Sequence, residues 1–274
     1  MKTLKSIIAL LAIAAIIVSC GEENEDPQTE IAGTVSIEFD NFVGSSMVNL
    51  KETGSTDYNY TTTEGQAFNL IRVQYYVSKI ILTGENGEVF EDDLNVSANA
   101  DEIRGYYFIQ ESESASKLIE LTDVPAGTYT QITFNLGIDE EGVQEGAAGG
   151  ILDPATGAPF WNWNAGYIGM TVEGQTDITD DKAFAIHVGG WKDIVPDDGT
   201  TQKFYNNVKT ITLNLDVDMN VSETLEPEIH IVADIQKVLG NIDFTATPQV
   251  HSPAAGRVFA DNLQSAFVVD HVHQ

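Results

Sequence analysis

The segment VPAGTYTQITFNL, residues 124–136, combines a turn signal with a strand signal and sets the expected fold. Proline restricts φ and glycine readily adopts positive φ, so Pro125 and Gly127 predict a tight turn. Apolar and polar residues then alternate through Ile132 and Phe134, which is the pattern of a strand with one buried face. A turn joined in this way to an amphipathic strand is typical of β-sandwich domains.

Similar strand signals recur along the chain. Residues 34–39 alternate in the same way. Residues 68–82 are rich in β-branched and aromatic side chains, which predicts one long strand or two strands with a break near Ser78. The pair Asn86-Gly87 predicts a hairpin turn directly after that segment.

Helical signals are few. Only residues 235–239 and 262–267 predict short helices, and the sequence has no internal repeat. Many short strands separated by turn signals favour an all-β protein. The sequence therefore predicts a single antiparallel β-sandwich over residues 33–274, with long loops and one or two short helices.

The first residues carry targeting signals. Lys2 and Lys5 precede an apolar run without charge, which predicts a signal peptide over residues 1–19. The only cysteine, Cys20, follows Ser19, and this ending resembles a bacterial lipoprotein box, in which the cysteine is diacylated through its sulfur. Cys20 is therefore the predicted point of attachment to outer-membrane lipid, facing the periplasm or the cell surface. A simple signal anchor is the alternative.

An acidic segment follows the lipoprotein box. Residues 20–32 contain little apolar surface and predict a flexible tether, and they resemble the surface-export signal of Bacteroidetes lipoproteins. The whole chain has a formal charge of −29, from 42 acidic and 13 basic residues. Such a surface repels nucleic acid, so DNA and RNA are excluded as partners.

Two of the three tryptophans lie close together, at Trp161 and Trp163. Because they are two residues apart, both rings would project from one face of a strand. His187 lies in a later apolar run that ends in Gly189-Gly190. If the two segments are neighbouring strands, an imidazole lies near the tryptophan pair. The alternative is an aromatic core cluster with a hydrogen-bonded histidine.

All five histidines lie in the second half of the chain. His271 and His273 have strand spacing, so both rings can face the same side and act as a pair of ligands. Imidazole suits copper, zinc, iron and nickel, and the fold contains no cysteine that could supply a thiolate. Scattered structural histidines are the alternative, and His230 with Asp234 could form a hydrogen-bonded pair.

Motifs of hydrolytic enzymes are absent from the sequence. It has no Gly-x-Ser-x-Gly elbow and no His-Glu-x-x-His motif. Carboxylates are numerous but no motif marks a glycosidase pair, so a hydrolase is the least favoured alternative. Acidic residues 139–142 and 177–181 could hold Ca²⁺, but neither segment has the ligand spacing of an EF-hand.

Several ordered motifs resemble the MbnP family, and the similarity extends from about residue 33 to the end of the chain. The combination of FWNWNAGY with FAIHVG is the most specific part. The sequence departs from the family pattern at Asn41, where many relatives have histidine, and at Asn162. The motifs are YYVSKIIL (75–82), FWNWNAGY (160–167), FAIHVG (184–189), IVADI (231–235), VHSP (250–253) and DHVH (270–273).

This resemblance implies an exported copper-binding protein that is not itself an enzyme. Related proteins hold copper through histidines near a kynurenine, which a dihaem partner enzyme, MbnH, forms from tryptophan. Carried over to this chain, Trp161 or Trp163 is the expected site of oxidation, and His187 is the best-matched copper ligand. The further candidate ligands are His230, His271 and His273. A surface module that binds glycans or another protein without a metal is the alternative function.

Overall fold

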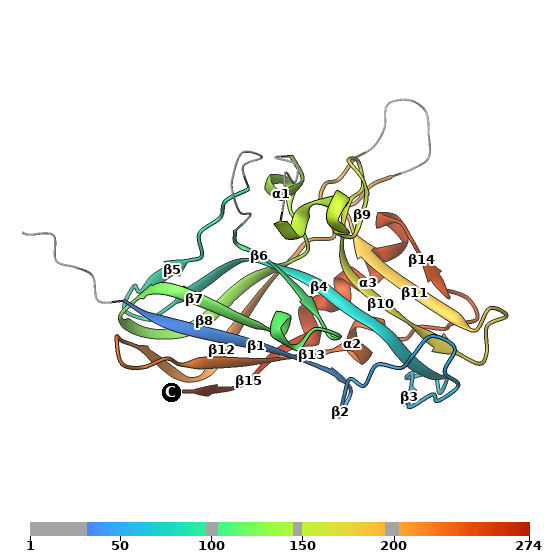
Figure 1. The fold of residues 1–274 in the computed structure, drawn as a ribbon, viewed down its shortest axis with the longest axis horizontal. Coiled ribbons are helices and arrows are strands. Elements are labelled where there is room, and N and C mark those ends of the chain that lie inside the picture. Colours follow the sequence, from blue (N-terminus) through green and yellow to red (C-terminus); the bar gives the residue numbers. More distant parts are fainter. Residues whose placement is uncertain (1–31, 97–103, 145–149, 195–202) are drawn as a thin grey trace, which may run out of the picture. The chain divides into compact units, whose positions relative to one another are not determined.

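Two β-sheets with an apolar core between them form the body of the protein (Figure 1). The computed structural model describes residues 32–96, 104–144, 150–194 and 203–274. The predicted signal peptide, Cys20 and nearly all of the tether lie outside the described residues. No helix within the described residues is long and apolar enough to cross a membrane.

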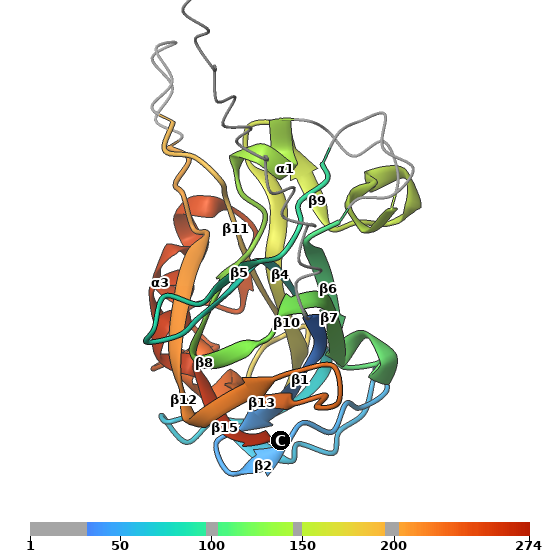
Figure 2. The same cartoon turned by 90° about the vertical axis from the view of Figure 1, so that its left-hand side faces the viewer.

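The first sheet has the strand order β15-β13-β1-β2, with β7 also paired to β1. Strand β1 lies parallel to β13 and antiparallel to β7. Figure 2 shows β1, β13 and β15 side by side near the C-terminus. The strands of this sheet are β1 (Ala32–Val43), β2 (Ser46–Met47), β7 (Leu118–Pro125), β13 (Glu228–Asp234) and β15 (Phe267–His273).

The second sheet has the order β12-β8-β4-β10-β11-β14, with four further strands paired to β4 or β10. All its pairings are antiparallel among the described residues except that of β11 with β14. Its strands are β3 (Tyr60–Thr61), β4 (Ala67–Thr83), β5 (Val89–Glu91), β6 (Tyr106–Gln110), β8 (Gly127–Leu136), β9 (Phe160–Asn162), β10 (Gly166–Thr176), β11 (Ala183–Gly189), β12 (Lys209–Val221) and β14 (Gln249–Val250).

The predicted all-β sandwich is therefore confirmed, with one refinement. The sheets are mixed, because β1 pairs with β13 and β11 pairs with β14 in parallel. Apolar and polar residues alternate with period two in both kinds of pairing, so sequence patterning could not distinguish them.

The turn at Pro125 and Gly127 connects the two sheets. Strand β7 ends at Pro125 in the first sheet, and β8 begins at Gly127 in the second. The Tyr129 hydroxyl donates a hydrogen bond of 2.9 Å to the Pro125 carbonyl oxygen, which holds the turn closed. The chain thus passes from one layer to the other within a few residues.

The predicted irregularity in the long strand is also present. Strand β4 is continuous, but its register against β8 shifts between Ser78 and Ile81, and Lys79 has a φ of 52°. The hairpin at Asn86-Gly87 joins β4 to β5, and Gly87 has a φ of 96° that suits glycine.

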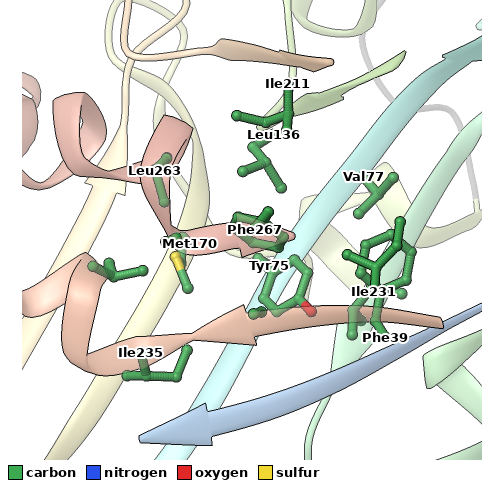
Figure 3. Close-up of a cluster of buried hydrophobic side chains, with 14 of the residues drawn as sticks. Phe39, Tyr75, Val77, Leu136, Met170, Ile211, Ile231, Ile235, Leu263 and Phe267 are labelled. Carbon is green, nitrogen blue, oxygen red and sulfur yellow. The ribbon is translucent and has the colours of Figure 1, made fainter. Parts of the chain in front are cut away.

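Aromatic rings hold the sheets together at the centre of the core (Figure 3). Phe39 of β1 and Phe267 of β15 face Tyr75 of β4 and Phe134 of β8, with edge-to-face centroid distances of 5.6–6.1 Å. Each such pair contributes about 0.5–1.5 kcal/mol beyond the burial of its area. Residues that alternate with these rings point outward, and these outward positions include the histidines.

The helices cover the ends and edges of the sheets. Helix α2 (Ile235–Leu239) matches the prediction, and the Asp234 side chain caps it by accepting a 3.0 Å hydrogen bond from Gln236 N. Helix α3 (Pro253–Ala266) is longer than the predicted 262–267, because Ser252 caps it and proline occupies its first position. The remaining short helices are α1 (Glu140–Gln144), η1 (Ser114–Lys117), η2 (Gly150–Leu152) and η3 (Pro154–Thr156).

Candidate metal centres

The five histidines form two clusters on different sheets. His187 at β11 and His251 just after β14 belong to the second sheet. His230 on β13 lies with His271 and His273 of β15 in the first sheet. The strand neighbours of His187 and His230 are buried, so these two histidines point away from the core. The four predicted ligands, His187, His230, His271 and His273, therefore do not form one site.

The first cluster, which we call the histidine pair, consists of His187 and His251. The parallel register of β11 and β14 sets buried Ile186 opposite buried Val250, and the next residue on each segment is the histidine. The two Nδ1 atoms lie 3.0 Å apart. His251 was not among the predicted ligands, although it belongs to the VHSP motif.

Each ring of the histidine pair has an oxygen atom at its other nitrogen. His187 Nε2 lies 2.8 Å from Glu173 Oε1, and His251 Nε2 lies 2.8 Å from Gln249 Oε1. These oxygens accept hydrogen bonds, so both Nε2 atoms carry the proton when the rings are neutral. Both Nδ1 lone pairs then face each other across 3.0 Å. Such lone pairs repel unless a proton or a cation lies between them.

Burial favours the neutral form of His251. Burial, followed by the charge of His187, lowers the pKa of His251, and Glu173 opposes this with a smaller effect. The hydrogen bond from His187 lowers the pKa of Glu173, and Arg72 adds to this through an ion pair of 3.0 Å. Glu173 is therefore a carboxylate that orients His187, as the partners behind metal-bound imidazoles do.

Trp161 lies on the same face as the histidine pair. Its Cζ3 atom would be 3.1 Å from a Cβ built on Gly189, so the indole packs directly over that glycine. Gly189 follows His187 by two positions on β11, and alternate strand residues share a face. Trp161 thus packs against the strand that carries His187, and its proximity to the His187 ring stays a prediction.

Trp163 lies elsewhere, so the expectation that both tryptophan rings share a strand face is wrong. Strand β9 ends at Asn162, whose side chain accepts hydrogen bonds from Asn164 N (2.9 Å) and Ala165 N (3.0 Å) and starts a turn. The Trp163 ring is 57% exposed and packs edge-on against Phe160. Asn162, which is one of the two departures from the family pattern, is therefore the residue that ends strand β9.

The second cluster, which we call the histidine trio, consists of His230, His271 and His273. One nitrogen of each ring lies within 4.8 Å of the others. His271 Nε2 is 3.0 Å from His273 Nε2, and its Nδ1 is 2.7 Å from Asp270 Oδ2. This repeats the arrangement of the histidine pair, with a carboxylate behind one of two converging imidazoles.

The alternative pairing of His230 with Asp234 is not found. Asp234 instead caps helix α2 and accepts a 3.0 Å hydrogen bond from Gly44 N. His230 lies among carboxylates, with Nε2 2.6 Å from Glu228 Oε1 and Nδ1 3.3 Å from Glu38 Oε2.

Comparison with known proteins identifies the family. A sequence model of the MbnP family matches residues 32–252. The chain belongs to the MbnP family. The structure is also similar to MbnP from Methylosinus trichosporium, with a TM-score of 0.50, 15% identity and coverage of 82% of each chain. That identity supports a shared fold and no more. No curated protein sequence matches the chain.

The two histidine clusters differ in how much of each lies within the residues that match the MbnP family. Residues 32–252 include Trp161 and both members of the histidine pair. His271 and His273 lie beyond the matched residues, although His230 lies within them. Asn41, the other departure from the family pattern, is buried in the interior and donates a 2.9 Å hydrogen bond to Glu111. Its side chain belongs to neither cluster.

Proposed function

We propose that this MbnP-family protein is a lipid-anchored copper-binding protein whose copper ligands are His187 and His251. The observation that carries this proposal is the approach of the two Nδ1 atoms to 3.0 Å while both Nε2 atoms face acceptors. Two ligands about 2.0 Å from one ion are about 3 Å apart when they subtend an angle near 100°. The pair thus has the spacing of two ligands of a single ion.

The donor set suits copper better than a hard cation. Imidazole nitrogens bind copper strongly, whereas Ca²⁺ and Mg²⁺ require several oxygen ligands. The Glu173 carboxylate accepts a hydrogen bond from the protonated Nε2 of His187 and leaves the Nδ1 lone pair free, which fixes the tautomer that a ligand needs. Arg72 forms a 3.0 Å ion pair with Glu173 and holds that carboxylate in place behind His187.

Trp161 is our preferred site of oxidation to kynurenine. Its indole lies over Gly189 on the face that carries His187, whereas Trp163 packs on Phe160 in the following turn. In this conversion the C2–C3 bond of the indole breaks and C2 leaves as formate. The peptide gains one oxygen atom and loses one carbon atom. Counting the formate as formic acid, the net change consumes three water molecules and releases four protons and four electrons. The chain supplies no oxidant, so a dihaem enzyme of the MbnH type would accept the four electrons.

The proposal assigns no catalysis to the chain itself. Residues His187 and His251 bind and orient, and Trp161 is modified by a partner. Cys20 would attach the protein to outer-membrane lipid, on the periplasmic side or at the cell surface. Acyl-chain mass on the N-terminal peptide, measured on protein from its native host, tests that anchorage.

Copper titration of the purified full chain in detergent tests the central part of the proposal. We expect one strongly bound copper ion that is lost in His187→Gln and in His251→Gln. Thr212→Ala is the control, because it removes an exposed polar side chain from strand β12 of the same sheet, away from both histidine clusters. Unchanged copper binding in both pair variants would contradict the assignment.

A surface module for glycans or proteins is the second candidate, and the exposure of Trp163 favours it. Its ring is 57% exposed, and an exposed indole can stack on a sugar ring. Trp163→Ala would then abolish binding to a glycan array and leave copper binding unchanged. A chain that binds neither copper nor glycans would exclude both candidates.

A further inference from the structure

The histidine trio occupies a block of outward positions on neighbouring strands. Register places Glu228 opposite His273 and His230 opposite His271 on β13 and β15. Glu38 of β1 lies opposite His230 on its other side. Alternate residues of these strands face outward, so the five side chains share one polar face. None of them contributes to the apolar core.

A register shift beside this block brings Asp270 to His271. The pairing of β13 with β15 passes from His271 to Val269 and skips Asp270, which is therefore an extra residue in a bulge. Adjacent residues on a regular strand would point to opposite faces. In the bulge, Asp270 Oδ2 lies 2.7 Å from His271 Nδ1. That contact keeps the proton on Nδ1 and leaves a lone pair at Nε2, which faces His273 Nε2 at 3.0 Å.

His230 supplies an independent sign of a missing partner. Its Nε2 atom is buried and makes no hydrogen bond, although Glu228 Oε1 lies only 2.6 Å away. The Glu228 carboxylate is therefore near enough to this nitrogen for both to reach one cation after a small shift. Glu38 Oε2, at 3.3 Å from Nδ1, can accept the ring proton and leave Nε2 as the donor atom. A buried ring nitrogen without a partner is costly unless something binds it.

We propose that His230, His271, His273 and Glu228 form a second metal site, distinct from the copper site, that binds a divalent cation of the zinc class. Three imidazole nitrogens and one carboxylate oxygen make a four-ligand set that Zn²⁺ accepts. Two of the three rings have a carboxylate behind them. Asp270 orients His271, and Glu38 orients His230. The surrounding carboxylates also offset the charge of a dication.

Binding requires one local rearrangement. The rings of His230 and His271 are stacked, with centroids 4.2 Å apart and planes 13° from parallel. Parallel rings cannot both aim a lone pair at one ion, so at least one ring must rotate about χ2. That torsion is broad for histidine, and both side chains lie near the surface. Zinc binding is therefore expected to break the stack.

A cation at this site would link two neighbouring strands. Strand β15 is the outer strand of its sheet in the described order, and its inner neighbour is β13. A cation held by His230 and Glu228 on one strand and by His271 and His273 on the other would cross-link the two. Zinc should then stabilise the C-terminal strand, because a ligand that binds only the folded state raises its stability.

The test uses the full chain in detergent, freed of metal by chelation and titrated with Zn²⁺ alone by calorimetry. The His251→Gln background removes the histidine pair from the measurement. In that background we expect one zinc ion per chain, an increase in melting temperature with zinc, and changed ¹⁵N shifts at His230 Nε2 and His271 Nε2. Adding His271→Gln should abolish the shift in melting temperature and weaken zinc binding by more than the roughly 10–100-fold that loss of an outer partner costs.

His273→Gln decides the matter if His271→Gln fails to fold, because His273 is exposed. Loss of zinc binding in either folded variant supports the site. Zinc binding that disappears with His251→Gln alone, or that survives both trio substitutions, would overturn it. The copper proposal is tested with the His187 and His251 variants, and the zinc proposal with the His271 and His273 variants. Failure of one proposal can therefore be distinguished from failure of the other.

Discussion

The two histidine clusters share a local design and differ in their surroundings. In each, a carboxylate lies behind one imidazole, and two ring nitrogens converge at 3.0 Å. The histidine pair lies beside Trp161 and inside the family match, with Arg72 balancing its carboxylate. The trio lies beside the carboxylates of Glu38 and Glu228 and extends beyond the family match. The comparison indicates that similar imidazole geometry can serve two metals, with the neighbouring groups deciding which.

Crossed removal of one ligand from each cluster should give the largest effect. His251→Gln should abolish copper binding at the histidine pair and leave zinc binding at the trio intact, and His273→Gln should do the reverse. The physical reason is that the clusters lie on different sheets and share no side chain. Copper and zinc titrations of both variants measure this. Loss of both metals in either variant would show that the clusters are coupled.

Removal of the carboxylate behind each imidazole should have a smaller effect. Glu173→Gln should weaken copper binding and Asp270→Asn should weaken zinc binding, each by about 10–100-fold, because a neutral partner orients and polarises the ring less. Competition with a chelator of known affinity measures both constants. Equal weakening of copper by the two substitutions would mean that the effect comes from overall charge.

The position of Trp161 can be changed without altering a ligand. A Cβ at Gly189 would lie 3.1 Å from Trp161 Cζ3 and 2.3 Å from the Tyr167 carbonyl oxygen. Gly189→Ala should therefore displace the indole, cost about 1–3 kcal/mol of stability, and reduce oxidation of Trp161. Peptide mass mapping after coexpression with a dihaem partner measures this.

Gly174→Ala is the matched control for that substitution, because it crowds Asn69 and Phe184 in the same sheet and not Trp161. It should lower stability and leave the modification of Trp161 intact. If Gly189→Ala and Gly174→Ala reduced the oxidation of Trp161 equally, the cause would be lower stability and not the position of the indole.

The smallest expected effect is a dependence of stability on pH. Burial and His187 lower the pKa of His251 in the folded state, so the unfolded chain binds a proton there more readily. This contribution to stability is complete above the ordinary histidine pKa of about 6.5 and is lost as the pH falls through the folded value. Metal-free wild type should therefore lose stability below about pH 6.5, and His251→Gln should lose less. Denaturant unfolding at several pH values measures the difference, and identical profiles would contradict it.

Local sequence signals predicted most of the fold. Alternation located β1 and β8, the Asn86-Gly87 pair located a hairpin, and Ser78 marked the irregularity in β4. The parallel pairings were not predictable, because strand partners depend on contacts between residues far apart in the sequence. The length of α3 was underestimated, although Ser252 and the following proline are start signals.

The candidate sites were predictable only in part. The i, i+2 spacing of His271 and His273 correctly gave a shared face. The partition of the histidines into two clusters depends on strand pairing, and no sequence spacing encodes that. His251 was missed because it follows a two-residue strand, which shows no alternation. Trp163 was misplaced because the Asn162 side chain ends the strand by capping the next turn.

Copper content and the mass of the Trp161 peptide, measured together on protein purified from its native host, test the central claim most directly. The account predicts bound copper and a Trp161 peptide that has gained one oxygen atom and lost one carbon atom. It also predicts that the Trp163 side chain remains tryptophan, which fragmentation of the same peptide resolves. Copper-free protein with both tryptophans intact would contradict the account.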